Sequence, residues 1–512
     1  MPTLPPLPIK LPPGFFRNGT AYESAGRYYD GNLVRWQNGR IVPWGGWVPV
    51  FSGGAAFTGI ARGALTWRAN NGNPYGAIGT NTNLYIGTSG IYDDVTPGDL
   101  VAGRADSIAG PGYGVAGYGQ QSYGTGRIGS DAITLSAATW SMDSYGEVWI
   151  GVLNSDGRIL TYDPTTDDSV AALENAPTNN QAVMVTNEEY VLAIGAGGNG
   201  RIVQWPDQND NTNWTPSGTS TAGNLILRTQ GNLQCGKLFG TQTLLFTDLE
   251  VHALTFAGYP DIYGVEPLGQ HCGVVSPNAV AQIPNAVVWL GPTGFWFYNG
   301  FVQPLPCEVQ DYIFGTSGYG INTLQLAKVY AGVNSQKYEV TWFYPDASNV
   351  ENNRYVTMNY QNWPNVIFYF GELARTCWLD AGVFPTPQAV DPSGNYWAHE
   401  VGYLANGQPR SEIFLTSGPV ELGTGDRVIY ANGLLPDVQL PASLQVSIAG
   451  QMAPNGPSTT FGPYPISPNV YGFSPGRFCG RQVAVSYQQI VGQDGAWSIG
   501  KNRAFVAQGG KR

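Results

Sequence analysis

The sequence predicts an all-β protein whose main part is a β-propeller. Short apolar stretches, most of them closed by glycine turns, recur from about residue 50 to residue 412; they include 75–86, 147–162, 190–205, 243–254, 286–298, 337–344, 354–360 and 395–403. Most are rich in Val, Ile, Tyr, Trp and Phe, the residues that suit a pleated surface. Strands repeated regularly over a long chain are typical of radial β-architectures.

The composition agrees with an ordered, turn-rich protein. The chain has 69 glycines and 37 prolines among 512 residues, more than the roughly 12% that is usual for these two residues together. Charged residues make up only 12%, against about 25% in ordinary proteins. A surface with so little charge has little to keep it from associating, which suits a subunit of a larger assembly. An ordinary extracellular β-protein is the other interpretation.

The acidic balance argues against a protein that grips nucleic acid. The formal net charge is -11 and the basic residues are scattered, whereas binding to phosphates needs clustered Lys and Arg. An acidic wall could instead let DNA slide past, since it repels a polyanion over about 8 Å at physiological salt. A protein with this charge would let DNA pass without specific binding.

The cysteines and the start of the chain bear on the compartment. Five cysteines lie far apart without a CxxC pair, which predicts free thiols. The proline-rich start lacks the apolar region of a signal peptide, and no apolar stretch approaches the ~20 residues that span a bilayer. We expect synthesis in a cytoplasm and no membrane insertion.

Residues 1–50 are predicted to form an extended arm and a hairpin that dock the chain to a neighbour. Prolines keep 1–13 extended, and Asn38-Gly39 between 33–37 and 40–44 is a strong hairpin signal. Aromatic residues and Arg are favoured anchors at interfaces. The candidate docking residues are Phe15, Phe16, Arg17, Tyr28, Tyr29, Arg35, Trp36, Trp44 and Trp47. The alternative is that this segment supplies a strand that closes the propeller on itself.

The propeller is expected to span 51–415 and a small β-sandwich-like domain 416–512. Strands of that last domain are predicted around 428–430, 444–448, 482–487 and 497–499. Within the propeller, 110–129 is a low-complexity stretch of glycines with interleaved tyrosines, which is typical of a long loop. Tyr113, Tyr118 and Tyr123 are the candidates for a loop that lines or gates a channel.

Two glycine motifs resemble nucleotide-binding signatures but lack their context. Gly195–Gly200 matches G-x-G-x-x-G, yet an alternating, strand-like stretch follows where the dinucleotide fingerprint needs a helix. Gly231–Lys237 matches G-x-x-x-x-G-K, but Leu238 follows where Mg²⁺ binding needs Ser or Thr. The first predicts a hairpin loop and the second a chance match, so we expect no cofactor.

No catalytic or metal site is predicted. Asp207–Asn213 is rich in oxygen but lacks the Gly and the Glu of a calcium loop, so a turn stabilised by Asn and Asp side chains is the better interpretation. The three histidines, His252, His271 and His399, have no metal-binding spacing, and no nucleophile elbow is present. We therefore expect that the chain is not an enzyme.

Several stretches resemble virion structural proteins of tailed bacteriophages. They are Leu11–Gly14, Arg17–Thr20, Gly26–Asp30, Leu33–Arg35, Gly45–Trp47, Arg62–Trp67, Trp140–Asp143, Gly146–Glu147, Asn285–Asn299, Leu305–Tyr312 and Asp426–Val428. The nearest role is that of the tail nozzle or tail-hub proteins of short-tailed phages. The resemblance implies β-propeller subunits that form a six-fold tube below the portal and adaptor, and it implies no catalytic residue.

The sequence therefore predicts a structural subunit of a phage tail, of nozzle or hub type. Its expected partners are copies of itself, with a hexamer as the expected ring, the portal or adaptor, and other tail proteins; its expected location is the virion. A receptor- or glycan-binding propeller at a tail tip or fibre is the alternative. A hydrolase on a propeller scaffold, with carboxylates clustered at the mouth of the ring, is a third.

Overall fold

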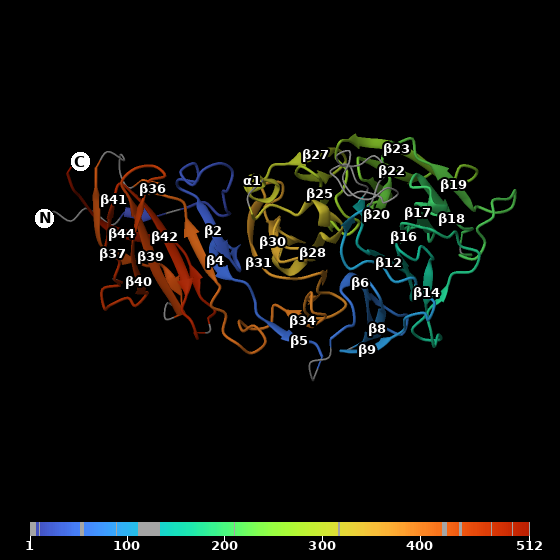
Figure 1. Ribbon diagram of the computed structural model, residues 1–512, viewed down its shortest axis with the longest axis horizontal. Coiled ribbons are helices and arrows are strands. Elements are labelled where there is room, and N and C mark those ends of the chain that lie inside the picture. Colours follow the sequence, from blue (N-terminus) through green and yellow to red (C-terminus); the bar gives the residue numbers. More distant parts are fainter. Residues whose placement is uncertain are drawn as a thin grey trace, which may run out of the picture.

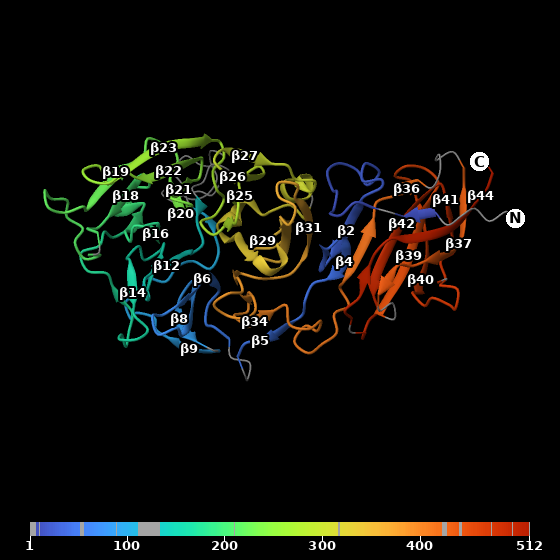
Figure 2. The ribbon, with the colours of Figure 1, turned by 180° about the vertical axis from the view of Figure 1, so that it is seen from behind.

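The fold is all-β, with a propeller and a second β-lobe side by side along the longest axis of the molecule (Figure 1). The same arrangement is seen from behind in Figure 2, where both chain ends lie in the second lobe. The computed structural model describes residues 7–9, 11–51, 56–88, 90–110, 134–208, 210–315, 318–421, 427–439, 443–472, 474–493 and 495–510.

Seven four-stranded antiparallel sheets form the blades of the propeller. Neighbouring blades touch through their innermost strands, in the closed order β6, β12, β16, β20, β24, β28, β32 and back to β6. The blades are β6–β9 (Ala61–Arg68, Pro74–Thr80, Leu84–Thr88, Ile91–Asp94), β12–β15 (Trp140–Tyr145, Val148–Leu153, Leu160–Tyr162, Ala171–Ala172), β16–β19 (Ala182–Val185, Val191–Ile194, Ile202–Trp205, Gly223–Ile226), β20–β23 (Leu233–Phe239, Gln242–Thr247, Glu250–Phe256, Tyr263–Gln270), β24–β27 (Val280–Ile283, Ala286–Leu290, Phe295–Tyr298, Val302–Leu305), β28–β31 (Tyr330–Asn334, Glu339–Tyr344, Arg354–Asn359, Ile367–Glu372), and β32–β34 (Cys377–Leu379, Gln388–Val390, Tyr396–His399) with β5 (Trp47–Pro49).

The seventh blade takes its outer strand from the beginning of the chain. β5 pairs with β34, with His399 opposite Trp47 and Trp397 opposite Pro49. The seventh blade is thus completed by two segments that are more than 300 residues apart. Because β5 comes just before the first blade in the chain, its place in the seventh blade ties the first blade to the last. This is the alternative that the sequence left open for the N-terminal segment.

The second lobe is a β-sandwich-like domain built from both ends of the chain. Strands β1–β4 lie at one end of each of its three sheets, next to strands that follow residue 413, and Figure 1 shows these blue and red segments side by side. The sheet orders are β1-β44-β37-β41, β2-β35-β42-β39-β40 with β36 beside β42, and β3-β4-β43-β38. Their bounds are β1 Leu7–Ile9, β2 Tyr28–Asn32, β3 Val34–Gln37, β4 Arg40–Pro43, β35 Phe414–Ser417, β36 Val420–Glu421, β37 Ile429–Leu435, β38 Val438–Gln439, β39 Leu444–Gln451, β40 Ser458–Pro465, β41 Phe478–Gly480, β42 Gln482–Gln489, β43 Ser498–Ile499 and β44 Asn502–Gln508.

This topology corrects the prediction of a separate N-terminal unit. The predicted hairpin is present as β3 and β4, and both Asn38 and Gly39 have the positive φ that a tight hairpin turn favours. However, β4 also pairs with β43, and β2 pairs with β35. Residues 1–50 are therefore not a domain of their own, since the described strands in this range belong to the second lobe and to the seventh blade.

Helices are few and short in the residues that the structure describes. They are α1 (Gln310–Phe314) and three 3-10 turns, Ala196–Gly198, Thr323–Lys328 and Ser335–Lys337. A two-stranded sheet, β10 (Ile108–Ala109) with β11 (Thr134–Leu135), lies in the connection between the first and second blades. The largest cluster of buried apolar side chains runs from the second lobe into the last four blades and the first blade.

A glycine on an inner strand sets the distance between two blades. A Cβ at Gly332 of β28 would lie 2.4 Å from Cγ of Trp378 in the seventh blade. The indole of Trp378 donates a hydrogen bond to the Val333 carbonyl, so the ring cannot move away without losing it. We expect Gly332→Ala to lower the free energy of unfolding by about 1–3 kcal/mol, as overpacking does, in urea titrations followed by tryptophan fluorescence.

The matched control is a glycine on an outer strand. A Cβ at Gly264 of β23 would meet nothing within 4 Å. Gly264→Ala should therefore leave the urea midpoint almost unchanged. Equal urea midpoints for the two variants would show that the packing of Trp378 against β28 does not require a glycine at position 332.

Candidate functional site

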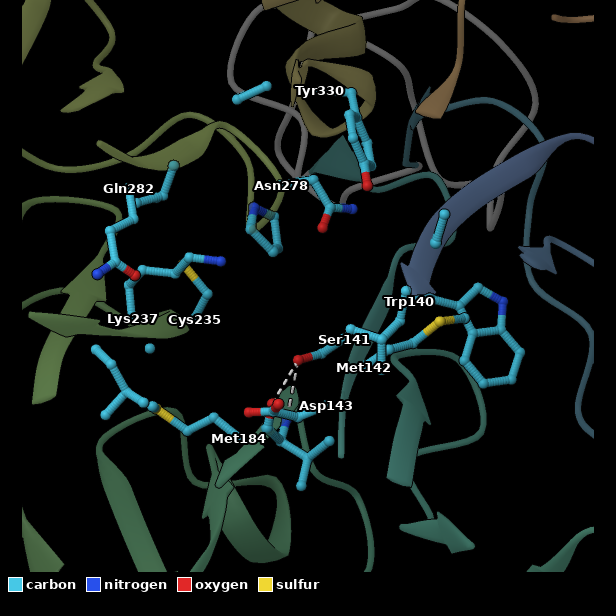
Figure 3. Close-up of a pocket in the computed structure, with 18 residues that line it drawn as sticks. Trp140, Ser141, Met142, Asp143, Met184, Cys235, Lys237, Asn278, Gln282 and Tyr330 are labelled. Carbon is cyan, nitrogen blue, oxygen red and sulfur yellow. Dashed lines mark hydrogen bonds between the residues drawn. The ribbon is translucent and has the colours of Figure 1, made fainter. Parts of the chain in front are cut away.

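The innermost strands of the blades surround a cavity of about 290 Å³ on the propeller axis (Figure 3). It is lined from six of the seven inner strands and from the loop before β24. The wall is mixed: Met142, Met184 and Leu65 are apolar, while Asp143 and Lys237 carry opposite charges. Such a concave site with a few polar groups is where a small ligand would bind.

Ser141 and Asp143 complete the backbone hydrogen bonding of the neighbouring blade. The Ser141 hydroxyl donates to the Val183 carbonyl and accepts from the Val183 amide. The Asp143 carboxylate accepts from the amide of Val185 at 2.8 Å. An innermost strand has no sheet partner on its axial side, so these side chains satisfy groups that would otherwise be left unpaired. Both residues are therefore held in fixed positions.

Two further polar side chains reach the cavity from the far blades. Figure 3 shows Asn278 and Tyr330 pointing toward the same space as Lys237 and Asp143. The Asn278 side-chain amide donates a hydrogen bond to the Arg62 carbonyl of the first blade at 3.0 Å. This bond links the loop before β24 to the first blade at one side of the cavity. Burial raises the pKa of the Tyr330 hydroxyl well above its usual value. Tyr330 is therefore a neutral hydrogen-bonding group.

The connection between the first two blades crosses one end of the axis. Ser107 exchanges two backbone-to-side-chain hydrogen bonds with Gln325, which precedes the sixth blade. Nearby, the buried ammonium of Lys328 pairs with Asp106 and Glu351. The connection thus reaches the segment that leads into the sixth blade. The candidate channel residues Tyr113, Tyr118 and Tyr123, in the same connection, lie outside the described residues.

The predicted docking residues form an interface, but it is an interface within the chain. Five of them are buried: Phe15, Tyr28, Arg35, Trp36 and Trp44. Their rings pack against the sixth blade: Phe15 on Phe370 at 4.9 Å, Trp36 on Tyr369 at 5.7 Å and Trp44 on Tyr355 at 4.7 Å between ring centroids. This corrects the docking prediction for these five, because they offer a neighbouring subunit no surface.

The other four predicted docking residues are half-buried. The Arg17 guanidinium lies 3.9 Å from the centre of the Tyr29 ring and pairs with Asp30. The Arg27 guanidinium lies over the Phe16 ring, and the guanidinium groups of Arg375 and Arg410 lie 5.2 and 5.4 Å from the centre of the Trp47 ring. Their contacts are likewise with residues of their own chain. Any part that they take in binding a neighbour stays a prediction.

A buried ion cluster joins the two lobes. Arg35 on β3 donates to both carboxylate oxygens of Glu400, at 2.6 and 2.9 Å, and its Nε lies 3.0 Å from Glu339 on β29. Burial, opposed by Arg35, raises the pKa of Glu339 to about 7. Tyr369 donates a hydrogen bond to the same carboxylate. A single guanidinium thus neutralises carboxylates from two blades.

The motifs that the sequence analysis discounted have structural roles. Gly195–Gly200 is the hairpin loop between β17 and β18, as predicted. Asp207 accepts hydrogen bonds from the Thr221 amide and hydroxyl, so it stabilises a turn. Lys237, however, belongs to the cavity. In the part of the chain that the structure describes, no group of three His, Cys, Asp or Glu is placed to hold a metal ion, and no helix is long and apolar enough to cross a membrane.

His399 is the most buried histidine, and it is held neutral. Burial and the nearby charges of Arg375, Arg410 and Arg35 lower its pKa well below the usual value, and its Nε2 accepts from Nε of Arg375 at 2.9 Å. Below about pH 6.5 the unfolded chain takes up a proton that the folded chain does not. The free energy of unfolding therefore decreases by about 1.4 kcal/mol for each unit by which the pH is lowered.

We expect this loss to depend on the imidazole. Between pH 7.5 and pH 5.0 the free energy of unfolding of the wild type should fall about 2 kcal/mol further than that of His399→Gln, since Gln keeps an acceptor for Arg375. Urea titrations at the two pH values measure the difference. The same substitution at the exposed His271 controls for the loss of an imidazole elsewhere. A wild type and a His399→Gln variant with equal pH dependence would contradict the expectation.

Comparisons with known proteins leave the function open. No family model matches the chain, and no curated protein matches it. Among solved structures, it is similar to a catalytically inactive virginiamycin B lyase from Staphylococcus aureus with quinupristin (7% identity, TM-score 0.40, 67% of this chain and 97% of that one). It is also similar to a streptogramin B lyase (9%, 0.40, 69% and 96%) and to Kluyvelomyces marxianus Hsv2 (8%, 0.29, 49% and 72%). These likenesses are too remote to bear on what the chain does.

Proposed function

We propose that this chain is a structural subunit of a bacteriophage tail, of nozzle or hub type, that forms a ring with copies of itself around the DNA exit channel. The observation that carries the proposal is the way the two lobes are locked together. The N-terminal strands pair in both lobes, and a buried ion cluster joins them. A body that must hold its shape while DNA passes needs such a fixed connection.

The propeller axis itself is not the conduit in this proposal. The axial cavity measures about 290 Å³, and the connection before the second blade crosses one end of it. A DNA duplex therefore has no path through a single propeller. The channel would lie between copies, where the net charge of -11 per chain would repel the phosphates from the wall.

The surface supports association with other proteins. Only 12% of the residues are charged, and several apolar side chains are largely exposed, among them Val470 at 94% and Val491 at 74% in the second lobe. Exposed apolar groups on a surface with little charge favour contacts between subunits. The expected neighbours are further copies, the portal or adaptor, and other tail proteins in the virion.

The mass of the purified protein tests the proposal. We expect light scattering to give a closed oligomer, with a hexamer as the expected number, and electron-microscopic class averages to show a ring with a hole wide enough for duplex DNA. A monomer or trimer without an axial hole would overturn the ring. The same class averages of intact particles should place the ring below the portal.

A receptor- or glycan-binding role at a tail tip is the second candidate. It is favoured by aromatic side chains on exposed turns: Tyr259 and Phe301 on neighbouring blades are each 76% exposed, and Tyr471 is 78% exposed. Aromatic faces of this kind can stack on sugars. A monomer or trimer that binds host surface polysaccharide, and loses that binding in Tyr259→Ala and Phe301→Ala, would favour this candidate over the ring.

A further inference from the structure

Two opposite charges face the axial cavity without touching each other. Lys237 projects from β20 in the fourth blade and Asp143 from β12 in the second, and Figure 3 shows both pointing into the cavity. No ion pair or hydrogen bond joins them among the described interactions, and the Lys237 ammonium has no partner there. They are the two charged residues in the lining of this cavity.

The carboxylate is fixed and the ammonium is free. Asp143 accepts hydrogen bonds from two backbone amides, those of Ser144 at 2.9 Å and Val185 at 2.8 Å. It therefore cannot swing toward Lys237 without leaving the Val185 amide unpaired. Lys237 therefore acts on the Asp143 carboxylate only across the cavity, without direct contact. Two charges held apart in a partly enclosed space are unfavourable unless water or a ligand bridges them.

The rest of the wall fits a small organic molecule. The volume of about 290 Å³ lies at the small end of ligand sites, which measure about 300–1,000 Å³. Met142 and Met184 supply flexible apolar surface that adapts to the shape of a ligand. Asn278 and Tyr330 add neutral hydrogen-bonding groups on the side opposite Met184 (Figure 3).

We propose that the axial cavity binds a small zwitterion of the free amino acid type, whose carboxylate pairs with Lys237 and whose ammonium pairs with Asp143. A zwitterion supplies one partner for each charge at once, whereas a simple anion or cation supplies only one. Charge-assisted hydrogen bonds of this kind are about twice as strong as neutral ones. This site is independent of the ring, because all its residues come from one propeller.

Binding of free amino acids to the full-length protein tests the proposal. The twenty amino acids are screened by saturation-transfer NMR, and the strongest binder is titrated by calorimetry. Its N-acetyl form keeps only the negative charge, its amide only the positive charge, and its N-acetyl amide neither. We expect the free amino acid to bind at least tenfold more tightly than either singly charged form, and the uncharged form not to bind.

The variants assign each charge. Lys237→Met should make the free amino acid and its amide bind alike, and Asp143→Asn should do the same for the free amino acid and its N-acetyl form. Lys501→Met in the second lobe removes an exposed lysine and should change nothing. The proposal is overturned if no free amino acid binds saturably, if the uncharged form binds as well as the zwitterion, or if Lys237→Met binds like the wild type.

Discussion

Replacing Arg35 with methionine is expected to lower the free energy of unfolding by about 3–5 kcal/mol, the cost of removing one partner from a buried ion pair. The side chains of Arg35, Glu339 and Glu400 are 3, 2 and 10% exposed. Without the guanidinium, two carboxylates from neighbouring blades face each other with no cation between them. Asn334 and Tyr369 would still donate hydrogen bonds, but they bring no charge. Urea titration followed by circular dichroism measures the loss.

Two further variants separate charge from packing. Arg40→Met removes a guanidinium that is 41% exposed and 3.9 Å from Asp437, and it should cost about 0–1 kcal/mol. Adding Glu339→Gln and Glu400→Gln to Arg35→Met should restore more than half of the loss. A triple variant no more stable than Arg35→Met would show that the packing of Arg35 against Trp44, rather than its charge, holds the lobes together.

The deficit of Arg35→Met should also depend on pH. Glu339 already has a pKa of about 7, and loss of Arg35 raises it further because the cation no longer favours the charged form. At pH 5 the folded variant can protonate this carboxylate, which relieves the buried charge. The difference in stability between wild type and variant should therefore be smaller at pH 5 than at pH 8.

Local patterns made most of the fold predictable. Alternating apolar stretches closed by glycine turns identified the blades, and Asn38-Gly39 located the β3–β4 hairpin, because both signals depend on near neighbours in the chain. In the second lobe, the predicted strands at 444–448 and 482–487 are the cores of β39 and β42.

Long-range contacts were not predictable in the same way. Nothing around Trp47 indicates that it pairs with His399, so the sequence predicted a closing strand only as an alternative and did not predict the number of blades. Phe15 and Trp36 suggested an interface because aromatic residues anchor interfaces. The partner surface turned out to be the sixth blade of the same chain, since composition does not distinguish an intramolecular neighbour from a second subunit.

The axial cavity left only a faint trace in the sequence. In the sequence, Lys237 is the last residue of a chance G-x-x-x-x-G-K match, and Asp143 belongs to a stretch that resembles phage proteins. Neither pattern indicates a cavity. Ser141 and Asp143 are two residues apart on one strand, so their side chains share a face, and this polar pattern marks a face that is not turned to an apolar core. That pattern becomes informative only once the strand is known to be innermost.

Removal of residues 1–49 is expected to abolish cooperative folding of the whole chain. The deletion takes β5 from the seventh blade, β2 from beside β35, and the β3–β4 hairpin from beside β43. It also exposes the aromatic surface of the sixth blade that Phe15 and Trp36 cover. We expect insoluble protein, or soluble protein without a single sharp unfolding transition, in expression trials followed by thermal denaturation. Coexpression of residues 11–51 as a separate chain should restore solubility.

A deletion of residues 1–10 separates folding from assembly. Within the described residues it removes β1, a three-residue edge strand that pairs only with β44, so the unfolding transition should stay cooperative. A shortened protein that folds but no longer forms the ring would show that the start of the chain docks to a neighbour, as the sequence predicted. One that still forms the ring would place the contacts between subunits elsewhere than in residues 1–10. A protein that lacks residues 1–49 and still unfolds like the wild type would contradict the role of β5 in completing the seventh blade of the propeller.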